Sequence, residues 1–576
     1  MPDALPDLIA RAIPAVGWMR RYRRDDLSGD IAAGLTTGIM LVPQAMAYAM
    51  LAGLPPSVGL YASTLPLIVY ALFGSSRQLA VGPVAIVSLL VASGVSELAE
   101  AGTPEYLGYA ALLALVVGVL QFAFGVLRLG MVANFISHAV ITGFTSAAAL
   151  VILLSQVKPL LGVNLAQTES TLHLIAELVA ALPQANPLTL MVGAGAIVVL
   201  AVLRARSPRF PASMLVVVLG TLATWALGLS GRGVAIVGDV PAGLPPLGIP
   251  AMDLDAATKL LPVALTILFV GFMESIAVAG MIAARERYKV DANRELVALG
   301  LGNVAAGLIS GYPVTGGFSR TAVNYQSGAR TGLASLFTAA VVVLTVLLLT
   351  PLFHYLPKAV LASVVVVAVV GLIDARGVRQ LFRVKVGDGL VAIVTFVVTL
   401  GVNVEVGIVS GVVLSLLQFI WRSSHPHIAE LGYVESEGAY LNVSRFPEAV
   451  RFPEAVLLRV DAALYFANMA FVENRLRRCL VDRPEVRWVV FDLSGVNDID
   501  ASAIYALQDI MESHRDLGIT FVFAGMKGPV RDVVTRAGWD DRFGHWRTCH
   551  SLPDALAEIG LSPRTDGGTP ATVRSG

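Results

Sequence analysis

Long apolar segments separated by short loops fill residues 29 to 422, and this pattern limits the folds that the chain can adopt. Charged residues make up only 14% of the chain, whereas soluble domains carry about 25%. Because a helix needs about 20 apolar residues to cross a bilayer, the pattern predicts a polytopic α-helical membrane protein. We expect fourteen segments, at 29–51, 57–73, 83–96, 107–127, 133–156, 187–203, 211–229, 260–284, 292–311, 317–329, 333–353, 358–373, 387–402 and 405–421.

The positive charges of the loops predict how these segments are oriented. With the N-terminus in the cytoplasm, the even-numbered loops carry Arg77, Arg128, Arg204, Arg206, Arg209, Arg285, Arg287, Lys289, Arg294, Arg330, Arg376, Arg379, Arg383 and Lys385. The odd-numbered loops carry only Lys158, Arg232, Lys259 and Lys358. Since cytoplasmic loops are the ones enriched in Lys and Arg, both termini are expected in the cytoplasm and the protein in the cell (inner) membrane. The two cysteines lie in the polar C-terminal part, which agrees with a reducing compartment.

The composition changes near residue 423, where the charge density rises and the long apolar runs stop. We therefore expect a cytoplasmic N-terminal segment at 1–28, a transmembrane domain at 29–422, a linker at 423–437, a soluble domain at 438–561 and a disordered tail at 562–576. The soluble domain alternates strand and helix patterns and predicts a small α/β fold. Strands are expected at 455–466, 487–493 and 519–524, and helices at 468–481, 501–517 and 529–537.

The hexapeptide Arg-Phe-Pro-Glu-Ala-Val occurs twice in direct succession, at 445–450 and at 451–456. A perfect tandem duplication of this kind resembles an insertion in the first loop of the soluble domain. We expect the fold to tolerate it, because lengthening a loop costs little free energy.

Fourteen segments divide into seven plus seven, and an odd number in each half makes the halves inverted in the membrane. The third and tenth segments hold matching positions, are short, and begin at Gly82-Pro83 and Gly316-Gly317. Paired, interrupted segments of this kind are the best sequence indication of a binding site at the middle of the membrane. Their N-terminal ends would bring two positive helix dipoles toward one point, although Gly and Pro also kink ordinary membrane helices.

Arg320 lies in the tenth segment, within a glycine-rich stretch shorter than one membrane thickness. An arginine at this depth costs at least about 2.5 kcal/mol on insertion scales, so it is rare unless it faces a cavity or a partner. A fixed cation at the start of a short helix suits an anion. Ser319 beside it can donate a hydroxyl hydrogen bond, and the backbone amides at Val84 and Ala85 are the corresponding donors of the third segment.

Glu274 lies about midway along the eighth segment, with no other charge nearer than Arg285. Ionisable groups inside a membrane are functional by default, so this carboxylate could hold and release a proton during transport. The alternative is a static salt bridge, for which Arg320 would be a partner.

Gln44 and Tyr48 lie four residues apart on the first segment and therefore share one helix face. Pro43 interrupts the backbone hydrogen bonds beside them. An amide donor and a phenol suit an oxyanion, although either residue alone could equally serve packing.

Other classes of function have no support in the residues. No nucleophile–base pair, metal-ligand cluster or phosphate loop has usable spacing, so we expect no enzyme, no metal and no cofactor. The formal net charge is zero, which does not suggest nucleic acid.

The chain resembles the SulP/SLC26 anion transporter family over almost its whole length. The motifs that carry this resemblance are Pro43-Gln-Ala-Met-Ala-Tyr-Ala-Met-Leu-Ala-Gly-Leu-Pro-Pro-Ser-Val-Gly-Leu-Tyr61, Gly82-Pro-Val-Ala-Ile-Val-Ser88 and Gly316-Gly-Phe-Ser-Arg-Thr-Ala-Val-Asn324. The soluble domain resembles a STAS domain, through Asp461-Ala-Ala-Leu-Tyr-Phe-Ala-Asn468 and Val490-Phe-Asp-Leu-Ser-Gly-Val-Asn-Asp-Ile-Asp500.

The resemblance implies core and gate domains that move relative to each other, and a homodimer. It also implies an anion pocket made by Gln44, Tyr48, Ser319 and Arg320, with Val84 at a position that is often aromatic in the family. Glu274 matches the carboxylate of the eighth helix in proton-coupled members. The sodium-coupled branch would have Asp there and Thr one turn later, where this chain has Val278.

In related anti-sigma antagonist proteins a serine is phosphorylated, and Ser502 is the matching residue here; a helix-terminal serine near a cap is the plainer interpretation. The soluble domain could also bind a cytosolic protein. Together these inferences predict a proton-coupled symporter of sulfate or a similar oxyanion. The alternatives are a bicarbonate, chloride or dicarboxylate transporter or exchanger, an uncoupled anion channel, a nucleobase permease, and a membrane protein that senses anions for its soluble domain.

Overall fold

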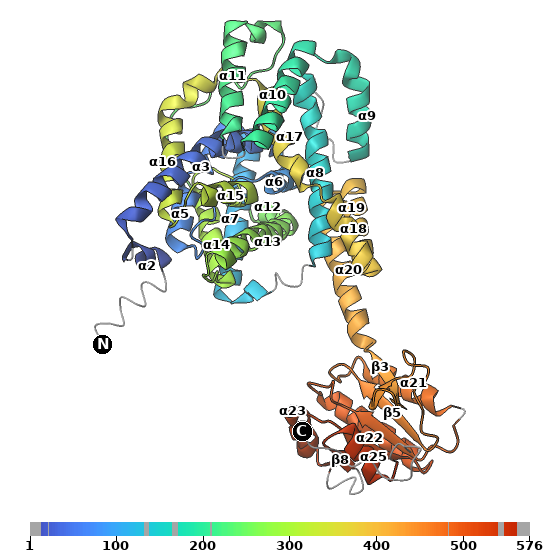
Figure 1. Cartoon of the computed structure of the whole chain (residues 1–576). Helices are drawn as coiled ribbons and strands as arrows, with labels where there is room; N and C mark the ends of the chain where they lie inside the picture. Colours follow the sequence, from blue (N-terminus) through green and yellow to red (C-terminus); the bar gives the residue numbers. More distant parts are fainter. Residues whose placement is uncertain are drawn as a thin grey trace. The chain divides into compact units, whose positions relative to one another are not determined.

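The computed structural model describes residues 13–20, 22–131, 137–163, 171–207, 210–481, 483–539 and 547–561. The chain divides into two compact units, Met1–Ser415 and Leu416–Gly576, which are described separately below (Figure 1). The predicted tail at 562–576 lies outside the described residues.

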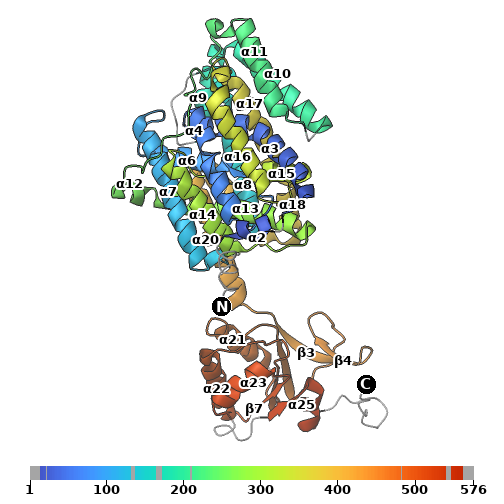
Figure 2. The same cartoon turned by 90° about the vertical axis from the view of Figure 1, so that its left-hand side faces the viewer.

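Helices make up almost all of the first unit. They are α2 (Pro14–Arg20), α3 (Arg24–Leu51), α4 (Pro56–Tyr61), α5 (Leu65–Phe73), α6 (Ala85–Ser96), α7 (Pro104–Val126), α8 (His138–Leu161), α9 (Thr171–Ala181), α10 (Pro187–Arg206), α11 (Ala212–Ala226), α12 (Leu254–Lys259), α13 (Leu261–Arg285), α14 (Ala292–Leu308), α15 (Phe318–Gln326), α16 (Leu333–Leu344), α17 (Lys358–Val369), α18 (Ala375–Val384), α19 (Val386–Gly401) and α20 (Val404–Ser424), the last of which continues into the second unit. Figure 1 and Figure 2 both show α10 beside α11.

The apolar segments expected from the sequence are helices in the structure. Nine stretches among the described residues are long and apolar enough to cross a membrane. They are Arg24–Leu51, Pro56–Phe73, Pro104–Val126, His138–Leu161, Pro187–Arg206, Leu261–Arg285, Leu333–Phe353, Lys358–Val384 and Val404–Ser424. The other five expected segments fall on α6, α11, α14, α15 and α19, which have 12, 15, 17, 9 and 16 residues.

Glycines allow the helices of the first unit to approach closely. A Cβ on Gly118 of α7 would lie 2.5 Å from the backbone nitrogen of Val304, and one on Gly300 of α14 would lie 2.5 Å from that of Phe122. Small residues at such contacts are typical of packed membrane helices, where backbones meet directly. Helices α7 and α14 are therefore packed closely, backbone against backbone.

Two fully buried carboxylates fasten helix ends to loops, and the sequence analysis did not single them out. Glu295, near the start of α14, accepts hydrogen bonds from the Tyr70 hydroxyl, from the backbone and hydroxyl of Ser75, and from the backbone of Ser76. Asp30 of α3 accepts from the backbone N–H of Arg330 and from both the N–H and the hydroxyl of Thr331. Each carboxylate has its lone pairs satisfied, which removes most of the cost of burying it.

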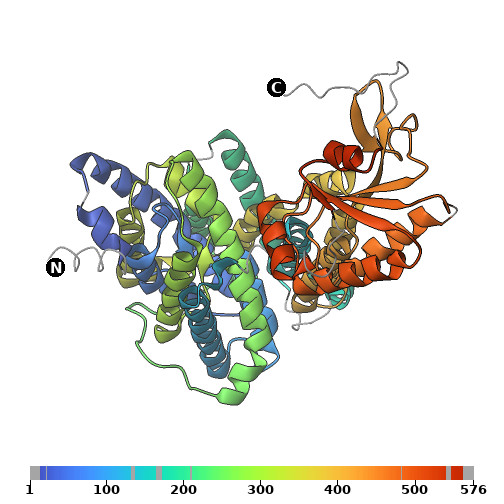
Figure 3. The ribbon, with the colours of Figure 1, turned by 90° about the horizontal axis from the view of Figure 1, so that it is seen from below.

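The second unit is a six-stranded sheet with helices on both faces (Figure 3). Its strands, in the order β4-β3-β5-β6-β7-β8, are β3 (Ile428–Val434), β4 (Ala439–Asn442), β5 (Ala455–Val460), β6 (Trp488–Asp492), β7 (Thr520–Ala524) and β8 (Arg547–Cys549). The helices are α21 (Met469–Leu480), α22 (Ala501–Arg515), α23 (Gly528–Arg536) and α25 (Leu552–Glu558). The expected α/β alternation is present from β5 to α23.

The predicted linker at 423–437 differs from the structure, because it contains β3, which pairs with β4 on one side and β5 on the other. The strand pattern is hidden there because β3 is covered on both faces, so its residues lack the alternation that indicates a half-buried strand.

The two copies of the duplicated hexapeptide have different environments. In the second copy, Arg451 forms an ion pair with the buried Glu430 and Phe452 packs against Tyr440, and its last two residues begin β5. In the first copy, Arg445 is exposed and Val450 pairs only through an isolated bridge to Tyr433. The second copy therefore makes the contacts that belong to the folded domain, whereas the first copy lengthens the connection from β4 to β5.

Candidate functional site

The two short segments that begin at glycine breaks meet in the structure. The two-residue strand β1 (Val81–Gly82) pairs antiparallel with β2 (Thr315–Gly316), and each strand leads directly into a half-helix, α6 or α15. The residues before these helices, Val84 and Gly317, make no side-chain capping hydrogen bond. The first backbone N–H groups of both half-helices thus carry the positive end of a helix dipole without a side-chain cap.

Arg320 is the third residue of α15, and its side chain is only 2% exposed. Its Nη1 donates a 2.5 Å hydrogen bond to the carbonyl oxygen of Pro83, just before α6. Its Nε and Nη2 atoms are buried and have no hydrogen-bond partner among the described residues. The guanidinium group therefore joins the two half-helices and keeps two donors for a further acceptor.

Gly82 makes room for this guanidinium group. Its φ of 152° is rare for residues that carry a side chain, and a Cβ there would lie 3.3 Å from Nη2 of Arg320. A Cβ on Gly317 would come within 2.9 Å of the same atom. The glycine breaks are thus required by the close approach of the backbone to Arg320.

Glu274 of α13 lies at the same place, and its carboxylate interacts electrostatically with the backbone N–H of Phe318, the first residue of α15. Its Oε2 atom is buried and has no hydrogen-bond partner in the part of the chain that the structure describes. Glu274 and Arg320 interact electrostatically, but no direct salt bridge joins these two described residues. The carboxylate consequently has one oxygen able to carry a proton.

Tyr48 and Gln44 lie on α3, and both are buried, each with 7% exposure. The hydroxyl group of Tyr48 is close enough to Arg320 and Glu274 to interact electrostatically with both. Gln44 lies one helical turn before Tyr48 on the same face. Helix α3 itself contacts both α6 and α15.

Ser319 and Phe318 are exposed at the start of α15, and the Phe318 side chain is 50% exposed. Val84 and Ala85 are buried at the start of α6, each with 6% exposure. The first two residues of α15 are therefore exposed, whereas the guanidinium group and the start of α6 are buried.

Tyr312 is a residue of this site that the sequence analysis did not select. It is fully buried, its hydroxyl lies 3.1 Å from the Ser88 hydroxyl on α6, and it interacts electrostatically with Arg320 and Tyr48. The only signal in the sequence is its place in the same glycine-rich stretch as Arg320. That signal does not say which way the ring points.

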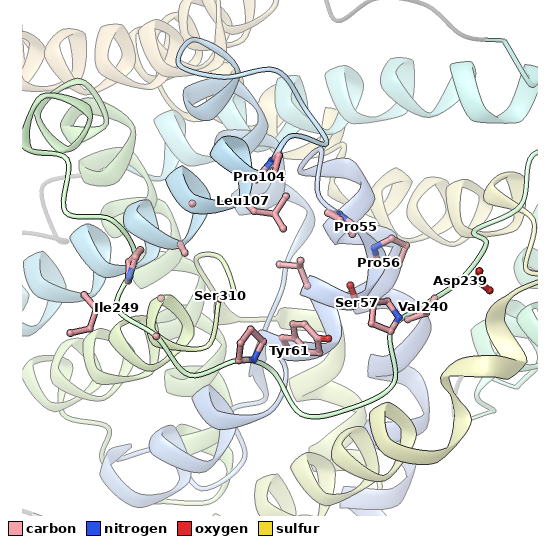
Figure 4. Close-up of a pocket in the computed structure, with 18 of the residues that line it drawn as sticks. Pro55, Pro56, Ser57, Tyr61, Pro104, Leu107, Asp239, Val240, Ile249 and Ser310 are labelled. Atoms are coloured by element: carbon pink, nitrogen blue, oxygen red, sulfur yellow. The ribbon is translucent and has the colours of Figure 1, made fainter.

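A cavity of about 700 Å³ in the first unit lies elsewhere (Figure 4). Its wall is rich in proline and apolar side chains, including Pro55, Pro104, Tyr61 and Ile249, and its one charged side chain is Asp239. An apolar wall with a single negative charge does not suit an anion.

Ser502 in the second unit is an exposed residue in the first turn of α22. The cap of this helix is Asp500, whose side chain accepts a hydrogen bond from the Ala503 N–H at 2.7 Å. The Ser502 hydroxyl is therefore not needed as the cap, and phosphorylation stays a prediction. The described residues also contain no group of three or more His, Cys, Asp and Glu side chains arranged to hold a metal ion.

Comparison with family models identifies both parts of the chain. Residues 27–395 match the sulfate permease family, and residues 446–555 match the STAS domain. The chain belongs to the sulfate permease family. It is a multi-pass membrane transporter with a C-terminal STAS domain and is not an enzyme.

Curated relatives match almost the whole chain. The chain is 39% identical to sulfate transporter 4.1, chloroplastic, of Arabidopsis thaliana over 559 residues, which covers 94% of this chain and 81% of that protein. It is 35% identical to a probable sulfate transporter of Mycobacterium tuberculosis over 549 residues, covering 94% and 97%.

Solved structures of this permease family agree with the fold. The murine Slc26a9 anion transporter in the inward-facing state has a TM-score of 0.89 and 25% identity, with coverage of 96% of this chain and 95% of that chain. The transmembrane domain of the cyanobacterial bicarbonate transporter BicA has a TM-score of 0.61 and 26% identity, covering 68% and 98%. The permease is thus an anion transporter of known architecture.

Proposed function

We propose that this permease is a proton-coupled symporter of sulfate or a similar oxyanion that works by alternating access. The observation that carries the proposal is the Arg320 guanidinium group beside the N-termini of α6 and α15, with Nε and Nη2 lacking a hydrogen-bond partner among the described residues. Uncapped helix N-termini and arginine are established partners of oxyanions. The names of the relatives, which are sulfate transporters, point to the same substrate.

In this proposal the anion binds where Ser319 is exposed and accepts hydrogen bonds from Arg320 and from the first amides of α6 and α15. Gln44 and Tyr48 complete the pocket from α3. The bound charge is stabilised because these donors are already in place and need no reorganisation. The half-helices and α13 then shift as a core domain against a gate domain and expose the site to the other side.

Glu274 carries the proton in this scheme. An ionised Glu274 would repel a bound anion and would occupy the Phe318 N–H that the anion needs. Protonation removes this repulsion, so the anion and the proton bind together. When the proton leaves on the opposite side, the repulsion returns and the anion dissociates. The absence of Thr one turn later, where Val278 lies, disfavours sodium as the coupling ion.

We further propose a homodimer in the cell membrane with both termini in the cytoplasm. Ser502 would be a phosphorylation site, and the STAS domain would bind a cytosolic protein. Cross-linking in native membranes tests the dimer, and mass spectrometry of protein from its own cells tests the modification.

Uptake of labelled sulfate into proteoliposomes tests the main proposal. We expect uptake to rise with an inward proton gradient in the wild type and to be independent of the gradient in Glu274→Gln. Sulfate uptake that ignores the gradient in the wild type would instead support a channel or exchanger. An absence of sulfate uptake, combined with uptake of bicarbonate or dicarboxylate, would change the substrate.

A further inference from the structure

A chain of hydrogen bonds fastens β2 to α13 directly beside Glu274. The Gly316 N–H donates to the Ser275 Oγ at 2.9 Å, and the Ser275 Oγ lies 2.8 Å from the Thr315 Oγ1. The Thr315 hydroxyl lies 2.6 Å from the Gly271 carbonyl oxygen. Ser275 is 0% exposed and Thr315 is 1% exposed, so water does not compete for these bonds.

The direction of every bond in this chain follows from the chemistry of its atoms. A carbonyl oxygen cannot donate, so the Thr315 hydroxyl must give its hydrogen to Gly271. The hydrogen between the two hydroxyl groups then belongs to Ser275, which accepts at the same time from the Gly316 N–H. Every donor in the chain is therefore used, and aligned chains of this kind strengthen each of their bonds.

Two glycines let the strand approach the helix this closely. A Cβ on Gly271 would lie 3.0 Å from the Thr315 Oγ1, and a Cβ on Gly316 would lie 2.8 Å from the Ser275 Oγ. Just before the strand, Asn303 of α14 holds Val314 by accepting from its N–H at 2.7 Å and donating to its carbonyl oxygen at 3.0 Å. The peptide that leads into α15 is thus held from two helices.

We propose that Ser275 is a positioning residue that keeps the proton-carrying Glu274 and the anion-binding N-terminus of α15 at one fixed separation. Ser275 follows Glu274 on α13, and it bonds Gly316, two residues before the Phe318 N–H that Glu274 contacts. The hydrogen bonds hold α13 and the start of α15 together. A change in the charge of Glu274 therefore changes the affinity for the anion instead of moving the helices apart. The inference rests on the proposed function and adds the link between its two sites.

The variant Ser275→Ala tests this role. It leaves the Gly316 N–H buried without an acceptor, which weakens the link between β2 and α13. We expect the KM for sulfate to rise about tenfold. We also expect the proton gradient to stimulate uptake less than in the wild type, while the maximal rate changes little. Ser275→Cys keeps a weak donor and acceptor. Its KM and its proton stimulation should therefore lie between those of the wild type and those of Ser275→Ala.

Ser363→Ala is the matched control, because Ser363 is also a fully buried serine whose hydroxyl bonds two backbone carbonyls, of Gly193 and Ala359, away from the half-helices. It should lower the melting temperature about as much as Ser275→Ala but leave the KM and the proton stimulation unchanged. Equal effects of the two variants on KM and proton stimulation would overturn the positioning role.

A second pair of variants covers the case in which Ser275→Ala does not fold. Gly271→Ala leaves Ser275 in place and pushes on Thr315. Gly280→Ala adds the same methyl group to the same helix at a place where, apart from the adjoining backbone of that helix, no described atom lies within 4 Å. Gly271→Ala should reproduce the loss of proton stimulation, and Gly280→Ala should not. If the proton gradient stimulates sulfate uptake by Gly271→Ala as much as uptake by the wild type, the inference is wrong.

The two proposals fail in different ways. If Glu274→Gln leaves the proton dependence of uptake intact, the proposed coupling is wrong. If Glu274→Gln abolishes that dependence while Ser275→Ala and Gly271→Ala behave like their controls, only the positioning role is wrong.

Discussion

Arg320 shows at the scale of one residue how a charge can be kept inside a membrane protein. Its Nη1 is committed to the Pro83 carbonyl oxygen, and its planar group rests against glycines, so that Nε and Nη2 remain for a ligand. A lysine cannot reproduce this division, because its ammonium group is a single point of charge on a flexible stem.

Arg320→Lys should therefore bind sulfate at least tenfold more weakly than the wild type, and Arg320→Ala should not bind it measurably. Isothermal titration of the purified protein in detergent measures both affinities. The exposed Arg232→Lys serves as the control and should bind like the wild type. Wild-type affinity in Arg320→Lys would show that charge alone, without the guanidinium geometry, holds the anion.

Single buried carboxylates also hold helices in place. Glu295 accepts four hydrogen bonds that fasten α14 to α5 and to the loop after it. An amide in its place would point an NH₂ group at groups that donate.

Glu295→Gln should lower the free energy of unfolding by about 3 kcal/mol, because donors are left unpaired in a buried place. Thermal unfolding in detergent measures the loss, with the exposed Glu100→Gln as the control. A melting temperature equal to that of the control would mean that the carboxylate contributes little to the stability of the helix pair.

At the scale of elements, the sequence predicts the helices better than their contacts. Every expected apolar segment contains a helix, because twenty apolar residues in lipid have almost no other option. The strands β1 and β2 have only two residues each and form where the half-helices meet. No local sequence pattern predicts strands this short. The same limit hid Tyr312, whose role depends on which way a loop side chain points. It also hid β3, which is buried on both faces and therefore lacks the alternation of a half-buried strand.

The end of β5 in the STAS domain gives an element-scale prediction about pH. Burial opposes the ionisation of Asp461, but hydrogen bonds from Arg459 and His427 outweigh it and hold the pKa of this carboxyl group below its usual range. A carboxyl group whose pKa is lower in the folded state contributes stability above its unfolded pKa and loses it as the pH falls through its folded pKa.

Asp461→Asn should therefore be less stable than the wild type at pH 7, and the difference should shrink as the pH falls below about 4, near the usual pKa of aspartate. Hydrogen exchange of STAS peptides in the full-length protein measures this difference. The exposed Asp509→Asn should show no such dependence on pH. A stability difference that stays constant down to pH 3 would contradict the role of the ionised carboxylate.

At the scale of the whole molecule, the site is built from elements that are far apart in the sequence. Two half-helices from separate halves of the chain meet at β1 and β2, and α3 and α13 pack against them with Tyr48 and Glu274. A site on elements that move together can pass from one side of the membrane to the other without being dismantled.

The central claim is that Glu274 couples anion movement to protons. The most direct test compares labelled sulfate uptake by wild-type and Glu274→Gln proteoliposomes at several external pH values, with the internal pH held constant. The account predicts that wild-type uptake rises as the external pH falls, and that the variant still transports sulfate but shows a flat pH profile. A variant whose uptake rises with acidity as steeply as that of the wild type would contradict the account.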